Sequence, residues 1–381
     1  MASFLFVPYS AAGHVHPMLP VMAELTARGQ TVRVLVGAAF AAAVRSTGAE
    51  AIVLDSVPDV FVPERFVGAA ALRFLAGRAR RPRVNASAAR SMAHELGLRP
   101  LDLVVLDPMI GWADRVAQRL GVPSVLFSTT FAVSDEVCAA VDGCPQWACR
   151  LRPIVRRYRN PGRLVLVNAV PDLQPAAASI PGNVHLVGPL LRARSPRSEA
   201  RRWQVPEGHR VLYVSPGTVF ARGTAFFRAI ADAFVGQNWL VVMATGPLDP
   251  RTMGPIPSNV IALPWMPQPV VLDHSDVFLT HAGMNSCLEG LAAGVPMALA
   301  PRSSEQRFLA RRLVELGVGA HVNVHGSDPM RLRRAITALA DDPAARVAAA
   351  AWREDLARTD GTLLAADLLE NHVNVPGARL G

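Results

Sequence analysis

Short apolar runs alternate with longer helical patterns along most of the chain. Those at residues 4–7, 31–36, 51–54, 103–106, 124–127 and 164–167 are typical of buried strands. Between them, apolar residues recur every third or fourth position and predict helices, such as the one at 112–120 that Gly121 and Pro123 end. This order predicts an α/β fold with a parallel sheet. Segments 58–93 and 128–163 lack the alternation.

A second α/β pattern begins near Val211. It predicts strands at 211–215, 239–243, 260–263 and 277–280, with helices to about Val235 and at 285–293. A stretch rich in Arg, Ser and Pro separates the two patterns. We therefore expect two α/β domains, at 1–191 and 207–358, joined by a linker at 192–206. A last helical pattern at 361–373 lies within a C-terminal segment, 359–381.

The turn after the predicted strand 277–280 has the residue types of an anion site. It reads His281-Ala-Gly283-Met-Asn285-Ser286 and opens a helix. In an open α/β sheet such a turn lies at the carboxyl end of the strand, and the helix offers unpaired N–H groups to phosphate. The alternative is a capping box formed by Ser286 and Glu289, which needs no ligand.

Further binding groups stand on both sides of this turn. Trp265, Met266 and Gln268 precede it, and the acidic–amide pair Glu305 and Gln306 follows it. A second strand–turn–helix segment, Ser215-Pro216-Gly217-Thr218, could bring its backbone to the other side of a diphosphate. Capping does not require these groups, and together they suit a nucleotide diphosphate-sugar.

The first turn of the chain carries different chemistry. It contains His14 and His16 around a single glycine, Gly13, where a dinucleotide-binding fold would show GxGxxG. Asp107 follows the predicted strand 103–106 and belongs to the same sheet edge. Neutral imidazole is suited to proton transfer at neutral pH, although a lone His in a loop is also a common structural residue. His16, next to Pro17, is expected to be structural or to line an acceptor site.

Composition limits the class of protein. Hydrophobic residues make up 51% and charged residues 18%, which predicts folded domains with buried cores. No long apolar run or basic leader occurs, so we expect a cytoplasmic protein without stable membrane insertion. The net charge is +9 and all 39 basic residues are Arg, but the Arg-rich segments hold only two aromatics, Tyr158 and Trp203, so a nucleic-acid partner is not expected. The four Cys are expected to be packing residues.

Residues 265–306 resemble the C-terminal signature of the family 1 glycosyltransferases, in particular the bacterial branch that glycosylates macrolides and flavonoids. The resemblance implies that Trp265 stacks on the nucleobase, with Met266 beside it, and that Gln268 lies near the base and ribose. It further implies diphosphate contacts from His281, Gly283, Asn285 and Ser286, with Gly217 and Thr218 on the opposite side, a ribose contact from Glu289, and sugar contacts from Glu305 and Gln306.

The resemblance also implies the GT-B architecture of two facing Rossmann-like domains with an interdomain cleft, the first for the acceptor and the second for the donor. It implies as well that the last helix, in segment 359–381, crosses back to the first domain. It assigns the catalytic base to His14 and its partner to Asp107. The implied reaction is inverting transfer of a hexose from a UDP- or dTDP-sugar to a hydroxyl of a small hydrophobic acceptor, such as a polyketide, macrolide or flavonoid. We expect no cofactor and no metal, since no Asp-x-Asp occurs, and a monomer or homodimer.

Two alternatives stay open at this stage. One is another GT-B activity, on a lipid-linked acceptor or as a sugar-nucleotide epimerase. The other is a catalytically silent nucleotide-sugar-binding partner of a sister transferase.

Overall fold

The computed structural model describes residues 1–53, 100–143, 145–150, 153–160, 162–191, 205–217, 222–324 and 328–374. These residues form two compact units. Unit 1 holds the described residues among the first 192 together with those from Asp360 onward, and unit 2 holds those between Ala193 and Thr359. Each unit has its own parallel sheet and its own core.

The sheet of unit 1 has seven strands in the order β3-β2-β1-β4-β5-β6-β7, all parallel. The strands are β1 (Ser3–Val7), β2 (Thr31–Val36), β3 (Glu50–Val53), β4 (Leu103–Leu106), β5 (Ser124–Ser128), β6 (Val165–Val167) and β7 (Val184–Leu186). The central strands β1 and β4 are buried along their whole length, because helices cover both faces of a parallel sheet. The chain reverses strand order between β1 and β4, which is where open α/β sheets bind ligands.

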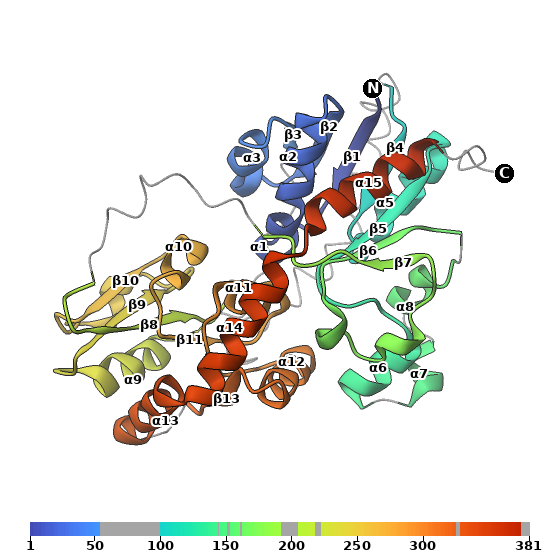
Figure 1. The fold of residues 1–381 in the computed structure, drawn as a ribbon. Coiled ribbons are helices and arrows are strands. Elements are labelled where there is room, and N and C mark those ends of the chain that lie inside the picture. The colour runs from blue at the N-terminus through green and yellow to red at the C-terminus, as the bar shows by residue number, and fades with distance from the viewer. Residues whose placement is uncertain are drawn as a thin grey trace, which may run out of the picture. The chain divides into compact units, whose positions relative to one another are not determined.

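The helices of unit 1 come from both ends of the chain. They are α1 (Ala12–Val15), α2 (Leu19–Ala27), α3 (Ala38–Arg45), α5 (Gly111–Leu120), α6 (Asp135–Asp142), α7 (Gln146–Arg150), α8 (Pro153–Tyr158) and α15 (Gly361–Asn374), with 3₁₀ turns at His16–Met18, Pro171–Leu173 and Ala177–Ser179. The C-terminal helix α15, red in Figure 1, packs on α2, which is blue. Its Ala365, Ala366 and Leu369 are fully buried in the core around Phe4 and Met22.

Polar contacts tie α15 to the first α/β unit as well. Arg28, at the end of α2, donates to Asp367 at 2.6 Å and to Glu370 at 2.7 Å, and the amide of Gln30 donates to Glu370 at 2.6 Å. The last helix is therefore part of the structure of unit 1, although more than 300 residues separate it from its partners.

The sheet of unit 2 has six parallel strands in the order β10-β9-β8-β11-β12-β13. They are β8 (Arg210–Ser215), β9 (Trp239–Ala244), β10 (Val260–Leu263), β11 (Val277–Thr280), β12 (Met297–Leu299) and β13 (Gly319–His321). The helices are α9 (Thr224–Phe234), α10 (Gln268–Leu272), α11 (Met284–Ala293), α12 (Ser304–Glu315), α13 (Pro329–Asp341) and α14 (Pro343–Ala357), with a 3₁₀ turn at Pro250–Met253. Phe226, Phe227, Ile230 and Phe234 fill the core between α9 and the sheet.

The predicted α/β class and the predicted strands agree with the structure to within one or two residues. The segment 128–163 was expected to break the alternation, and its described part holds the helices α6, α7 and α8 and no strand beyond the end of β5. Segment 58–93 lies outside the described residues. The first turn differs from the prediction, because His14 lies in the short helix α1, closed by hydrogen bonds from the N–H groups of His14 and Val15 to the carbonyl of Ala11.

The cysteines differ in state. Cys138 and Cys287 are free and buried, but Cys149 is disulfide-bonded, so the prediction that all four cysteines are packing residues is wrong at this position. Spacing rules for multi-disulfide frameworks do not detect a single bridge.

Among the described residues, no helix combines the length and apolar character needed to cross a membrane.

Candidate active site

The His14–Asp107 pair is the main polar feature at the carboxyl edge of the sheet in unit 1. Nδ1 of His14 lies 2.6 Å from Oδ2 of Asp107. Asp107 is buried, with 1% of its side chain exposed, whereas 23% of the His14 side chain is exposed. A carboxylate without access to solvent therefore holds one ring nitrogen, and the imidazole keeps an exposed face.

Sheet register explains this proximity. β1 and β4 are neighbours, with Val7 opposite Leu106, so the residues that follow them share one edge. α1 is the first helix after β1 and contains His14, while Asp107 is the first residue after β4. The N–H of Met109 donates to the other carboxylate oxygen of Asp107 at 2.8 Å and fixes its orientation. The predicted proximity of His14 and Asp107 is confirmed.

Two further residues surround the imidazole. Oγ1 of Thr129, which is buried, lies 3.2 Å from Nδ1 of His14, and the ring of Tyr9 meets the imidazole edge-on with centroids 5.1 Å apart. Thr129 follows β5, the next strand after β4, so the strand-end rule that selected Asp107 could also have found it.

His16 lies in the 3₁₀ turn that follows α1. Its ring meets the ring of Phe40 edge-on, with centroids 6.1 Å apart, in keeping with a packing role.

In unit 2, the predicted donor-binding residues follow the carboxyl ends of four strands. Gly217 follows β8, the segment from Trp265 to Gln268 follows β10, the turn beginning at His281 follows β11, and Glu305 and Gln306 follow β12. The structure therefore gathers these residues at one edge of one sheet. Thr218 lies outside the described residues.

The imidazole of His281 is enclosed by two glycines. A Cβ at Gly217 would lie 2.6 Å from Cε1 of His281, and one at Gly283 would lie 2.4 Å from Nε2, so any other residue at either position would displace the ring. Gly217 also has a φ of +83°, which disfavours other residues. This close approach brings the turns after β8 and β11 together around one ring.

His281 is electrostatically unusual. Its Nδ1 is buried and makes no hydrogen bond to a described residue. Burial, assisted by the positive charge of Arg222 and opposed by the carbonyl of Ser215, lowers the pKa of His281 to about 4. The imidazole is therefore neutral at neutral pH, and one of its nitrogens can donate a hydrogen bond.

The start of α11 decides between the two interpretations of Ser286. Gly283 is the N-cap of this helix, so Ser286 lies inside the first turn and not at the cap. The capping box of Ser286 and Glu289 is therefore wrong, because the helix begins earlier than that pairing requires. No side chain caps the helix, and its first turn is directed to the edge where His281 lies.

Glu289 has another partner. The amide Nε2 of Gln268 donates to Oε2 of Glu289 at 2.5 Å, and the hydroxyl of Tyr213 donates to Oε1 of Gln268 at 3.2 Å. Trp265 is 56% exposed and Met266 is buried. Hence the structure links two predicted donor residues directly, and it leaves Trp265, three residues before Gln268, exposed to solvent. Tyr213 carried no signal in the sequence, since it lies within an apolar strand.

Gln306 has a structural task that the sequence did not reveal. Its Oε1 accepts from the N–H of Arg302 at 2.8 Å and of Ser303 at 3.3 Å, while Oγ of Ser303 accepts from the N–H of Gln306 at 3.2 Å. This is a capping box at the start of α12. The carbonyl of the Gln306 side chain is therefore engaged, and the amide NH₂ is the part that can contact a sugar. Glu305 precedes it on the same first turn.

Arg222 is a second residue that sequence reasoning missed. It is 6% exposed, its Nη2 donates to the carbonyl of Ala300 at 2.8 Å, and its guanidinium lies 4.6 Å from the centre of the Phe226 ring. Ala300 follows β12, so this buried positive charge lies at the same edge as His281. Nothing in the sequence separates Arg222 from the other arginines.

Comparisons with known proteins agree with this geometry. The model of the family described as UDP-glucoronosyl and UDP-glucosyl transferase matches residues 165–349. Oleandomycin glycosyltransferase of Streptomyces antibioticus is 31% identical over 392 residues, which cover 95% of this chain and 88% of that protein. The 4'-demethylrebeccamycin synthase of Lentzea aerocolonigenes is 28% identical over 410 residues, covering 95% of this chain and 97% of that protein.

Among solved structures, the calicheamicin glycosyltransferase CalG4 superposes with a TM-score of 0.75 at 29% identity, covering 98% of both chains. The chain is therefore a glycosyltransferase with the GT-B fold, and it belongs to the UDP-glucuronosyl and UDP-glucosyl transferase family, family 1 of the glycosyltransferases. As a member of this family it acts on a sugar donor and an acceptor.

Proposed function

We propose that this protein transfers a hexose from a UDP- or dTDP-sugar to a hydroxyl group of a small-molecule natural product, with inversion and without a metal ion. The observation that carries the proposal is the pairing of partly exposed His14 with buried Asp107 at 2.6 Å. This arrangement is what a general base for an alcohol requires.

The proposed chemistry starts at the acceptor. An alcohol is a weak nucleophile, so a base must remove its proton as the new bond forms. Asp107 accepts a hydrogen bond from Nδ1–H of His14, which leaves Nε2 as the basic nitrogen and stabilises the imidazolium that forms. The acceptor oxygen attacks the anomeric carbon, the nucleoside diphosphate leaves, and the proton stays on His14. One displacement inverts the anomeric centre.

Unit 2 supplies the groups for the donor. Neutral His281, the first turn of α11 with Asn285 and Ser286, and the turn at Gly217 suit the diphosphate. Exposed Trp265 offers a stacking surface for a base, and the linked pair Gln268 and Glu289 suits ribose hydroxyls. Glu305 and the side-chain NH₂ group of Gln306 suit the sugar.

The acceptor class is inferred from relatives. Oleandomycin, calicheamicin and 4'-demethylrebeccamycin stand in the names of the similar proteins, and all three names denote small molecules. The hydrogen-bonded His14–Asp107 pair argues against a catalytically silent partner, since such a protein has no use for a poised base.

The test is a donor and acceptor matrix. Purified protein would be incubated with UDP-glucose or dTDP-glucose and a panel of polyketides, macrolides and flavonoids. Mass spectrometry should detect a product heavier by one hexose, and NMR coupling at the anomeric proton should show inversion from the donor. If no product forms with any acceptor while UDP stabilises the protein, a non-catalytic nucleotide-sugar-binding role would replace the proposal.

A further inference from the structure

A polar pocket lies at the amino edge of the sheet in unit 2, at the opposite ends of the strands from the residues described above. It has a volume of about 710 Å³ and is lined by Gly208, Arg210, Gly236, Gln237, Asn238, Trp239, Arg333, Arg334 and Thr337. Arg210 and Trp239 begin β8 and β9, whose carboxyl ends lead to the proposed donor site. A strand the length of β8 separates the two edges by roughly 20 Å.

The wall that the α9–β9 turn contributes is held rigidly. The side-chain amide of Asn259 donates to the carbonyls of Phe234 and Trp239, both at 2.8 Å. Gly236 has a φ of +67°, and the N–H of Arg210 donates to the carbonyl of Asn238 at 3.1 Å. The positions of Gln237 and Asn238 are therefore set before any ligand arrives, which lowers the entropy cost of binding.

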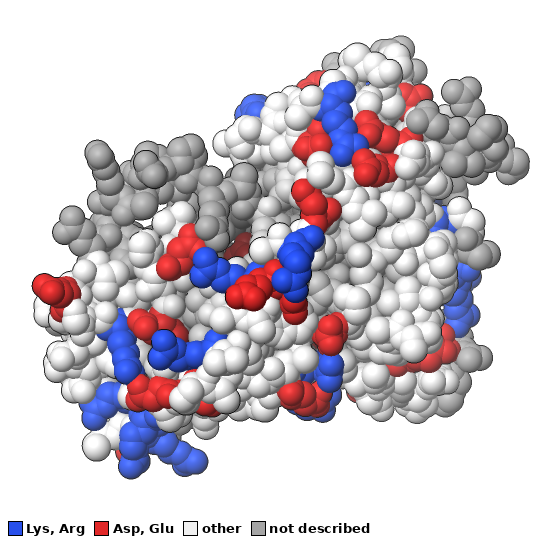
Figure 2. Space-filling model, viewed as in Figure 1, with Lys and Arg blue, Asp and Glu red and all other residues white. Residues whose placement is uncertain are grey.

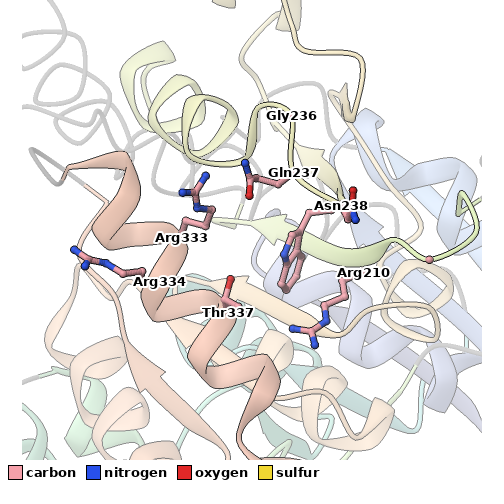
Figure 3. Close-up of a pocket in the computed structure, with 9 residues that line it drawn as sticks. Arg210, Gly236, Gln237, Asn238, Arg333, Arg334 and Thr337 are labelled. Atoms are coloured by element: carbon pink, nitrogen blue, oxygen red, sulfur yellow. The ribbon is translucent and has the colours of Figure 1, made fainter.

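Helix α13 forms the facing wall. Arg333 and Thr337 are one turn apart on one face, with Arg334 beside them (Figure 3). Asp341, one turn further on, pairs with Arg210 at 2.6 Å. No described carboxylate pairs with Arg333 or Arg334. Figure 2 shows basic side chains gathered over the part of unit 2 where α13 lies. The pocket thus keeps two guanidinium groups for a ligand after Arg210 is neutralised.

The lining selects the kind of anion. Trp239 is buried, with Arg210 5.7 Å from its ring and Phe234 packed edge-on at 5.3 Å, so no indole face is open to a nucleobase. What remains are planar guanidinium forks, a hydroxyl and side-chain amides, which match the oxygens of a phosphate group. The volume is in the range of small-molecule sites.

We propose that this pocket is a second, non-catalytic anion site, which takes the phosphate or diphosphate group of a small molecule. It makes no contact with the proposed donor site and does not depend on the transferase mechanism.

The experiment uses inorganic pyrophosphate as the probe and omits UDP, because UDP carries a diphosphate group and could occupy both sites. Isothermal titration calorimetry should detect one binding event beyond that of the donor site in the full-length protein. Arg333→Gln and Arg334→Gln together should weaken it at least about tenfold, since each removes a charge-assisted hydrogen bond. Arg333→Lys should weaken it less, because the charge stays while the fork is lost.

Arg331→Gln is the matched control, because Arg331 is exposed on the same helix but does not line the pocket. It should change the affinity less than about twofold. Hydrogen exchange should locate the protection at residues 236–239 and 333–337. The proposal is overturned if the double variant binds pyrophosphate as the wild type does, or if Arg331→Gln weakens binding as much as the double variant does. Thermal unfolding of each variant without ligand verifies that it is folded.

Discussion

At the scale of single residues, the role of His14 can be separated from donor binding. His14→Ala removes a group that acts only as the acceptor loses its proton, so we expect kcat to fall by about 10²–10⁴ while the dissociation constant for UDP stays unchanged. Asp107→Asn should lower kcat as well, since Asn cannot stabilise the imidazolium. Steady-state kinetics and calorimetry with UDP measure the two quantities.

A matched control is His16→Ala. His16 follows the short helix that holds His14, and its ring packs on Phe40. It should reproduce any general disturbance of the turn without the loss of a base. Near-normal turnover of His14→Ala on an alcohol acceptor would show that another group takes the proton.

The depressed pKa of His281 predicts a pH dependence of stability. In the unfolded chain this His titrates near its ordinary value of about 6.5, whereas in the folded protein it stays neutral down to about 4. Between these values the unfolded state binds more protons. The free energy of unfolding is therefore not reduced by this His above pH about 6.5, and it falls as the pH drops toward 4. In His281→Asn this loss of unfolding free energy should be smaller by up to about 3 kcal/mol. Denaturant titrations across the range measure it.

Arg222 provides the companion measurement. Its positive charge contributes to lowering the pKa of His281, so Arg222→Met should raise that pKa. NMR titration of labelled histidines would follow it, with His281→Asn to assign the signal. An unchanged pKa in Arg222→Met would leave burial as the whole cause.

The sequence predicted the residues that follow strands and failed where contacts come from distant segments. His14 and Asp107 could be paired because both follow buried strands at one sheet edge. Arg222 could not be recognised, since its burial depends on Phe226 and on Ala300, far along the chain. The alternative of a capping box at Ser286 is wrong, because pattern alone does not locate the first turn of a helix.

At the scale of elements, the docking of α15 depends on Gly361. A Cβ at this position would lie 1.9 Å from the carbonyl oxygen of Val187, which no rearrangement of a side chain can relieve. Gly361→Ala should therefore displace the start of α15 and destabilise unit 1 by about 1–3 kcal/mol. Hydrogen exchange should show lost protection in both α15 and α2, which pack together.

Gly182→Ala is the control for this change. A Cβ at Gly182 would meet nothing within 4 Å, so the same substitution in the same unit should leave stability within about 0.5 kcal/mol. If both variants behave alike, the contact with Val187 is not what places α15.

Strands could be predicted from the sequence where their apolar run was long enough to show a pattern. Strands β1 and β4 contain uninterrupted apolar runs of four residues, and the structure has both strands within one residue of the prediction. β7, β12 and β13 have three residues each, too few to show a period, and β13 is Gly-Ala-His, which carries no strand signal. Such short strands form because neighbouring strands offer hydrogen bonds to them.

At the scale of the whole molecule, the chain builds two α/β units and returns its last helix to the first. The pattern predicted a helix at the C-terminus, but the buried contacts of Ala365 and Leu369 with the core of unit 1 involve residues hundreds of positions away. Periodicity reports which face of a helix is apolar and not which core receives it. The resemblance to known enzymes was needed for that expectation.

The departing diphosphate needs groups that stabilise its developing negative charge. Transferases that use Mg²⁺ or Mn²⁺ hold the ion on carboxylate oxygens. Here the first turn of α11, neutral His281, the backbone at Gly217 and the buried charge of Arg222 stand at one sheet edge in unit 2. Such fixed donors stabilise charge as it develops in the transition state.

We therefore expect transfer to keep most of its rate after dialysis against EDTA, and Ser286→Ala to lower kcat more than chelation does. Ser286 lies in the first turn of α11 without serving as its cap, so its loss should not destabilise the helix start. Ser304→Ala, at the start of α12, is the matched serine control. Activity that disappears on chelation and returns with Mg²⁺, with Ser286→Ala unimpaired, would show that an ion and not these donors carries the charge of the leaving group.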